Sequence, residues 1–125
     1  MTHRTGNCFE DCFNKVTNPF NEDGFDWTMV HGMPLGASGL AAKAGRYPHA
    51  WLERISPNGE ILVEDPNTRG TYPAEMYYRL GRIVAEDCVR YTRSEAVEAA
   101  MESGTSGPWS KVLLDRDIEI EEMFA

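Results

Sequence analysis

A histidine and an aspartate in the middle of the chain have the residue types of two members of a nucleophilic triad, in which an imidazole moves a proton and a carboxylate orients the imidazole. His49 lies near the start of a predicted strand over residues 48–56, and Asp65 ends a second predicted strand over residues 60–65. If Gly59 is left-handed in a three-residue loop, the two side chains become diagonal neighbours on one sheet face, roughly 7–8 Å apart at the backbone. A two-residue loop would place them on opposite faces.

The nucleophile of such a triad could come from a helix predicted over residues 8–16. Asn7 has the place of its N-cap, with a glutamate three positions later as in a capping box. Cys8 would then lie on the first turn, where free backbone amides and the helix dipole favour a thiolate. Cys12, one turn further on, belongs to the apolar stripe of the helix and is expected to act as a small hydrophobe. Alternatively, both cysteines are core residues.

These features together resemble the transglutaminase-like branch of the papain-like cysteine enzymes. The residues that carry the resemblance are a cysteine that opens a helix, a strand reading His49-Ala50-Trp51-Leu52-Glu53, and a hairpin to a strand ending in Asp65-Pro66. The match covers residues 7–66, about half of the chain. It implies that Cys8 is the nucleophile, His49 the base and Asp65 the orienting carboxylate, within a papain-like or transglutaminase-like domain.

A second, weaker resemblance links the chain to small proteins encoded by phage and bacterial genomes. It rests on the compact length and on the segment from Tyr77-Tyr78 to Gly107-Pro108-Trp109. It implies no reaction of its own, and we expect the two tyrosines to be packing residues.

The chemistry of the expected triad is acyl transfer through a thioester, with no cofactor. An ordinary thiol is only about 3% ionised at pH 7, so an imidazolium at His49, stabilised by Asp65, would be needed to make thiolate the main form. The thiolate would attack an amide, and water or an amine would then take the acyl group, as in a peptidase, amidase, deamidase or transglutaminase. Candidate groups for the oxyanion or the substrate are the Cys8 amide and the side chains of Asn7, Trp51 and Trp109.

Composition limits the partners and the location of the protein. The chain has 125 residues, of which 42% are hydrophobic, and its net charge is −8. We expect one domain over residues 1–125, with residues 110–125 as a possible acidic C-terminal extension. The negative charge argues against nucleic acid or an anionic membrane as partner and favours a neutral or basic peptide or protein amide as substrate. Three cysteines and the lack of a long apolar run predict a cytoplasmic location; the oligomeric state stays open.

The expected fold is α+β, with the helix that carries Cys8 packed on a small antiparallel sheet. The predicted strands cover residues 25–31, 48–56, 60–65 and 88–91, and predicted helices over residues 73–80 and 94–102 cover the sheet. Within the tail, residues 112–114 and 118–120 are expected to add an edge strand or to lie on a partner.

Two other functions compete with the cysteine enzyme. A non-enzymatic acidic binding or inhibitor protein could keep the same fold and motif without the activity. A metal site could use His31, His49, Asp65 or a cysteine, although no compact ligand spacing supports it. We expect His31, which continues the core-facing side of the strand over residues 25–31, to be a structural histidine with its hydrogen bonds satisfied.

Overall fold

The computed structural model describes residues 5–18, 27–36, 43–68 and 70–125. Its elements, in chain order, are α1 (Thr5–Thr17), β1 (Thr28–Gly32), β2 (His49–Ile55), β3 (Ile61–Asp65), β4 (Gly70–Pro73), α3 (Ala74–Leu80), the 3₁₀ turn η2 (Ala85–Asp87), β5 (Val89–Tyr91), α4 (Arg93–Ser103) and α5 (Lys111–Met123). None of the helices in the described part of the chain is both long and apolar enough to cross a membrane.

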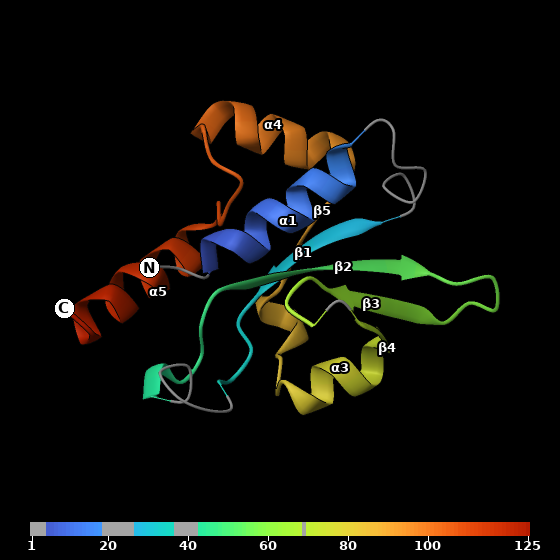
Figure 1. Ribbon diagram of the computed structural model, residues 1–125, viewed down its shortest axis with the longest axis horizontal. Helices are drawn as coiled ribbons and strands as arrows, with labels where there is room; N and C mark the ends of the chain where they lie inside the picture. The colour runs from blue at the N-terminus through green and yellow to red at the C-terminus, as the bar shows by residue number, and fades with distance from the viewer. Residues whose placement is uncertain (1–4, 19–26, 37–42, 69) are drawn as a thin grey trace.

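The strands form one antiparallel sheet in the order β4-β3-β2-β1-β5. Helices α1 and α4 pack on one face of the sheet, while α3 lies on the opposite face (Figure 1). This arrangement confirms the predicted α+β fold, with the N-terminal helix on a small antiparallel sheet.

The hairpin between β2 and β3 has the predicted register. Arg54 lies opposite Leu62, and the Ser56 amide donates to the Glu60 carbonyl at 2.7 Å. Gly59 has a φ of 88°, the left-handed conformation that a three-residue loop requires. The loop length therefore directs residues 49 and 65 to the same side of the sheet.

Apolar side chains form a core on each face of the sheet. Under α1, the buried set is Cys8, Phe9, Cys12, Val16, Trp27, Met29, Ala50, Leu52, Ala96 and Leu113. On the α3 side, the buried set is Val30, Trp51 and Val63. Alternate residues of β2 thus supply both cores, as the period of a strand dictates.

The sequence explains why α1 and α4, the two helices on the same face of the sheet, form. Most of the predicted apolar stripe of α1 is buried: Cys8, Phe9, Cys12 and Val16 are each at most 1% exposed, and Phe13 is partly buried against the same core. In α4, Thr92 and Glu95 form a capping box: the Thr92 hydroxyl accepts from the Glu95 amide at 3.2 Å, and the Glu95 carboxylate accepts from the Thr92 amide at 2.9 Å.

Three predicted boundaries or elements are wrong. Helix α1 begins at Thr5, so Asn7 lies inside the helix and is not its N-cap. No strand was predicted between residue 65 and the helix expected from residue 73, yet Gly70–Pro73 pairs with β3 as an edge strand. The predicted strand over residues 25–31 begins at Thr28 in the described residues, and residues 25 and 26 lie outside them.

The C-terminal segment is a helix, whereas an edge strand or a partner-bound segment was expected. Ser110 caps α5, its hydroxyl accepting from the Leu113 amide at 3.3 Å. Leu113 and Ile120, seven residues apart, are buried on one side of the helix. Arg116 donates to the carbonyls of Ala44 and Arg46, the latter at 2.8 Å. Residues 110–123 are thus packed against the rest of the domain.

Candidate active site

His49 and Asp65 meet at one end of the sheet. His49 is the first residue of β2, Asp65 is the last residue of the neighbouring β3, and their exposed fractions are 3% and 7%. The Nε2 atom of His49 lies 3.2 Å from Oδ2 of Asp65, within hydrogen-bonding distance. The structure therefore brings these two sequence-predicted residues into direct contact.

Cys8 contacts His49 from the face of the sheet that α1 covers. It lies on α1, and its thiol group is hydrogen-bonded with the His49 side chain. Helix α1 and the sheet can contribute to one site here because His49 is the first residue of β2. The chain enters the sheet at this point, below the start of α1 (Figure 1). The three predicted triad side chains are thus neighbours.

Electrostatics favour a protonated imidazole at this position. Burial by itself lowers the pKa of His49, but its hydrogen bonds with Asp65 and Cys8 outweigh burial and raise the pKa to about 9. Burial also acts to raise the pKa of Asp65, whereas the hydrogen bonds from His49, Tyr77 and the Asn67 amide bring it below its usual value. An ionised carboxylate beside an imidazolium is therefore the stable state near neutral pH.

Two further donors hold the Asp65 carboxylate. The Asn67 amide donates to Oδ1 at 2.8 Å, and the Tyr77 hydroxyl donates to Oδ2 at 2.5 Å. The Asn67 contact could have been foreseen, because an aspartate in a turn commonly accepts from the amide two residues on. Tyr77 was expected only to pack. Its contact depends on how β4 and α3 return across the sheet, for which the local sequence holds no signal.

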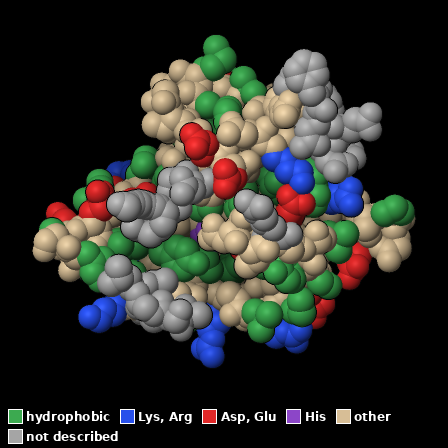
Figure 2. Space-filling model, in the orientation of Figure 1, with side chains coloured by type: hydrophobic (Ala, Val, Ile, Leu, Met, Phe, Trp, Pro, Cys, Tyr) green, Lys and Arg blue, Asp and Glu red, His purple; other side chains and the backbone are tan. Residues whose placement is uncertain are grey.

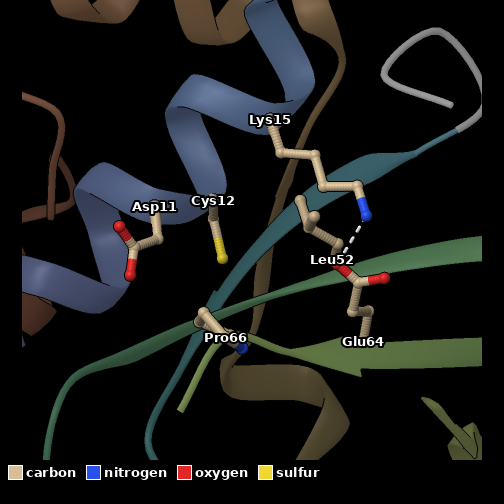
Figure 3. Close-up of a pocket in the computed structure, with 6 residues that line it drawn as sticks. All are labelled: Asp11, Cys12, Lys15, Leu52, Glu64 and Pro66. Atoms are coloured by element: carbon tan, nitrogen blue, oxygen red, sulfur yellow. Dashed lines mark hydrogen bonds and ion pairs between the residues drawn. The ribbon is translucent and has the colours of Figure 1, made fainter. Parts of the chain in front are cut away.

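Cys12 lies one turn along α1 and faces a different cavity. Its sulfur points toward Pro66 and Leu52 in a cavity of about 240 Å³, with the Lys15–Glu64 ion pair at 2.6 Å on the same wall (Figure 3). Burial raises the pKa of the Cys12 thiol well above its usual value, and the nearby Cys8 and Asp65 raise it further. Cys12 thus has the inert environment that its place in the apolar stripe predicts.

Two of the candidate oxyanion or substrate groups, Trp51 and Trp109, have their indole N–H groups bonded elsewhere in the structure. The indole N–H of Trp51 donates to Glu53 at 2.9 Å, and that of Trp109 donates to the Thr105 carbonyl at 3.0 Å. Each indole has a single N–H, so neither is available to an oxyanion in this structure. The Asn7 side chain lies outside what the structure describes, and Cys8 is the fourth helical residue rather than the first.

A cavity of about 320 Å³ borders the His49 ring and Asp65 from the α3 side. Its walls are mostly apolar and aromatic, comprising Pro34, Leu35, Tyr47, Thr68, Tyr72, Met76, Tyr77, Leu80, Gly81 and Ile83. Figure 2 shows hydrophobic side chains around a hollow in the middle of one face, with a trace of histidine surface at its bottom. The end of the sheet that carries His49 is therefore bordered by a largely apolar recess.

The other described histidine, His31, is isolated from this chemistry. It is fully buried, and no described residue hydrogen-bonds either of its ring nitrogens. The ring packs against Phe9, Tyr91 and Trp109 at centroid distances of 4.6, 4.8 and 5.1 Å. It is a core histidine, as expected, but its predicted hydrogen bonds are missing. Within the described residues, no three potential ligands gather as a metal site requires.

No protein-family model matches this chain, and neither a curated protein nor a solved structure does so. The argument for function accordingly rests on the geometry of the site.

Proposed function

We propose that this protein is a cysteine hydrolase or acyltransferase that acts on an amide through a thioester at Cys8. The observation that carries the proposal is the His49 side chain, which is hydrogen-bonded with Cys8 on one side and lies 3.2 Å from Asp65 on the other. A nucleophilic cysteine site needs these three groups in this order.

The reaction follows from the protonation state of His49. With a pKa of about 9, the ring holds a proton at neutral pH and Asp65 balances its charge. The Cys8 thiolate attacks the amide carbon, and His49 gives its proton to the leaving nitrogen as the C–N bond breaks. Water or an amine then gives a proton back to His49 while its oxygen or nitrogen attacks the thioester, and the Cys8 thiolate leaves.

The substrate that the charges favour is a neutral or basic peptide or protein amide. The chain has a net charge of −8, which disfavours anionic substrates. The cytoplasm, a reducing compartment, suits the proposal because Cys8, Cys12 and Cys88 are all thiols in the structure.

The near-complete burial of Cys8, at 1% exposure, is the observation that favours the alternative, a non-enzymatic acidic binding or inhibitor protein. In that protein the same three side chains would only hold α1 on the sheet. The two functions differ in whether the Cys8 sulfur can react.

Labelling with iodoacetamide between pH 5 and 9, read out for each cysteine by peptide mass spectrometry, tests the proposal. We expect Cys8 to label at pH 6–7 at least about tenfold faster than an ordinary thiol, because the latter is only about 3% ionised at pH 7 and less at pH 6. His49→Gln should abolish this advantage. Cys12→Ala is the matched control on the same helix and should leave it unchanged. Slow labelling of Cys8 with an ordinary thiol profile would favour the binding protein.

Product masses then separate the possible reactions. After incubation with a panel of peptide and protein amides, hydrolysis adds water, deamidation replaces an amide NH₂ by OH, and acyl transfer adds an amine with loss of ammonia. Cys8→Ala should abolish every such product, whereas Cys12→Ala should retain it and lose mainly stability. Product formation that survives Cys8→Ala would show that another group acts.

A further inference from the structure

Tyr77 and His49 share one oxygen atom of the buried Asp65 carboxylate. The Tyr77 hydroxyl donates to Oδ2 at 2.5 Å, and His49 Nε2 lies 3.2 Å from the same atom. The second oxygen, Oδ1, accepts from the Asn67 amide at 2.8 Å. The shorter of the two contacts to Oδ2 is thus made by the tyrosine, and the imidazole has the longer one.

We propose that Tyr77 is a positioning residue of this site, which fixes the Asp65 oxygen that faces His49 and limits how strongly that oxygen holds the imidazolium proton. The inference rests on the proposed function, since it concerns how the base of that site is tuned. Tyr77 acts through Asp65 and contacts neither the sulfur nor the reacting atoms.

The physical reason is competition for one acceptor. A donor on Oδ2 takes up part of its negative charge, so the same oxygen binds a second donor less strongly. His49 must release its proton to the leaving nitrogen, and a general acid works best when its pKa lies near the working pH. Because the pKa of His49 is already raised to about 9, a stronger bond to Asp65 would make it a poorer acid.

The protein holds the Tyr77 hydroxyl in place and keeps it protonated. Its ring lies on α3, packed against Trp51 at 5.4 Å between centroids and stacked on Tyr72 at 6.1 Å. Burial, followed by the adjacent Asp65 charge, raises the pKa of Tyr77 far above its usual value. The hydroxyl is therefore a donor throughout the pH range in which His49 titrates.

The groups around His49 come from four parts of the chain. Cys8 approaches from α1, Asp65 from β3 and Tyr77 from α3 by way of Asp65. Tyr47 precedes β2, with its ring centroid 5.8 Å from that of His49, and burial raises its pKa, so it stays neutral. Tyr77 can be changed to phenylalanine without removing a charge or the nucleophile, and its hydroxyl contacts Asp65 directly.

The test measures the pKa of His49 by NMR titration of its ring in Tyr77→Phe, which keeps the ring contacts and removes the hydroxyl. We expect the pKa of His49 to rise by about half a unit to one unit, the equivalent of one net hydrogen bond. The turnover of whichever amide the wild type processes should fall about three- to tenfold with little change in KM, because proton release to the leaving nitrogen slows.

Tyr78→Phe is the matched control, since Tyr78 is the next residue of α3 and its hydroxyl donates to a different buried carboxylate, Glu53. It should cost similar stability and leave the pKa of His49 unchanged. In an Asp65→Asn background, Tyr77→Phe should no longer shift the pKa of His49, because the coupling passes through the carboxylate.

Each result separates this inference from the proposed function. An unchanged or lower pKa of His49 in Tyr77→Phe overturns the inference, and so does an equal shift in Tyr78→Phe or a shift that persists with Asp65→Asn. Rapid, His49-dependent labelling of Cys8 in the wild type would still stand in those cases and support the enzyme. Conversely, slow labelling of wild-type Cys8 overturns the enzyme, whatever the titration of His49 shows.

Discussion

The two buried histidines show how partners, rather than burial, decide the charge of a residue. His49 and His31 are 3% and 0% exposed, so both lose hydration on folding. The pKa of His49 is nevertheless raised to about 9, because Asp65 and Cys8 stabilise the imidazolium against the effect of burial. The pKa of His31 falls to about 3, because burial among aromatic rings acts alone. The neutral His31 packs as an aromatic residue, while His49 can carry a proton.

His31 should make the protein sensitive to mild acid. Its pKa is about 3 in the folded state and about 6.5 in the unfolded chain, so unfolding takes up a proton below pH 6.5. The stability lost through this residue should reach about 2 kcal/mol at pH 5. Urea unfolding at pH 7 and pH 5 should show a smaller loss in His31→Leu than in the wild type. An equal loss in both proteins would contradict the assigned protonation state.

At the scale of elements, the β2–β3 hairpin was predictable because its signal is local. Gly59 and the residues before it specify the loop, and alternation along the strands then places His49 and Asp65 on one side. Helix α4 was predictable for the same reason, since its capping box spans only four residues. The contact between His49 and Asp65 thus follows from short-range chemistry.

The missed elements depend on contacts that local sequence does not encode. The tail contains two short apolar runs that mimic strand alternation, but the residues buried in α5 are Leu113 and Ile120, two helical turns apart. The edge strand β4 has only four residues and ends in proline, so its pairing with β3 leaves little local trace. Because β4 was not predicted, the contact between Tyr77 and Asp65 could not be predicted either.

The register of the hairpin should not depend on Gly59 alone. A Cβ at Gly59 would meet no atom within 4 Å, so Gly59→Ala strains only the left-handed backbone. We expect it to cost about 1–2 kcal/mol in the free energy of unfolding. The NMR titration of His49 should stay unchanged, because the burial of Trp51 and Val63 on one face holds the register.

Gly104→Ala is the matched control, since Gly104 is left-handed at the end of α4 and also has open space around it. The two variants should cost similar stability. A titration of His49 that changes in Gly59→Ala but not in Gly104→Ala would show that the loop itself sets the register.

At the scale of the whole molecule, the first helix, the sheet and the last helix share one core. Leu113 of α5 is buried in the same cluster as Cys8, Phe9 and Met29. Residues far apart in the sequence therefore stabilise the helix that carries the proposed nucleophile. Residues 110–123 should belong to the cooperative unit and not behave as a separate extension.

Leu113→Ala tests this cooperativity. Removing a buried leucine side chain should cost about 2–5 kcal/mol, a large share of the stability of a small domain. Met123→Ala on the same helix is the control: Met123 is 53% exposed, so its loss should cost little. In Leu113→Ala, the urea transition followed by tryptophan fluorescence and that followed by the NMR signal of His49 should move together to lower urea. If instead α5 frays in hydrogen exchange while the His49 transition stays in place, residues 110–123 are an independent extension and the core around His49 ends before them.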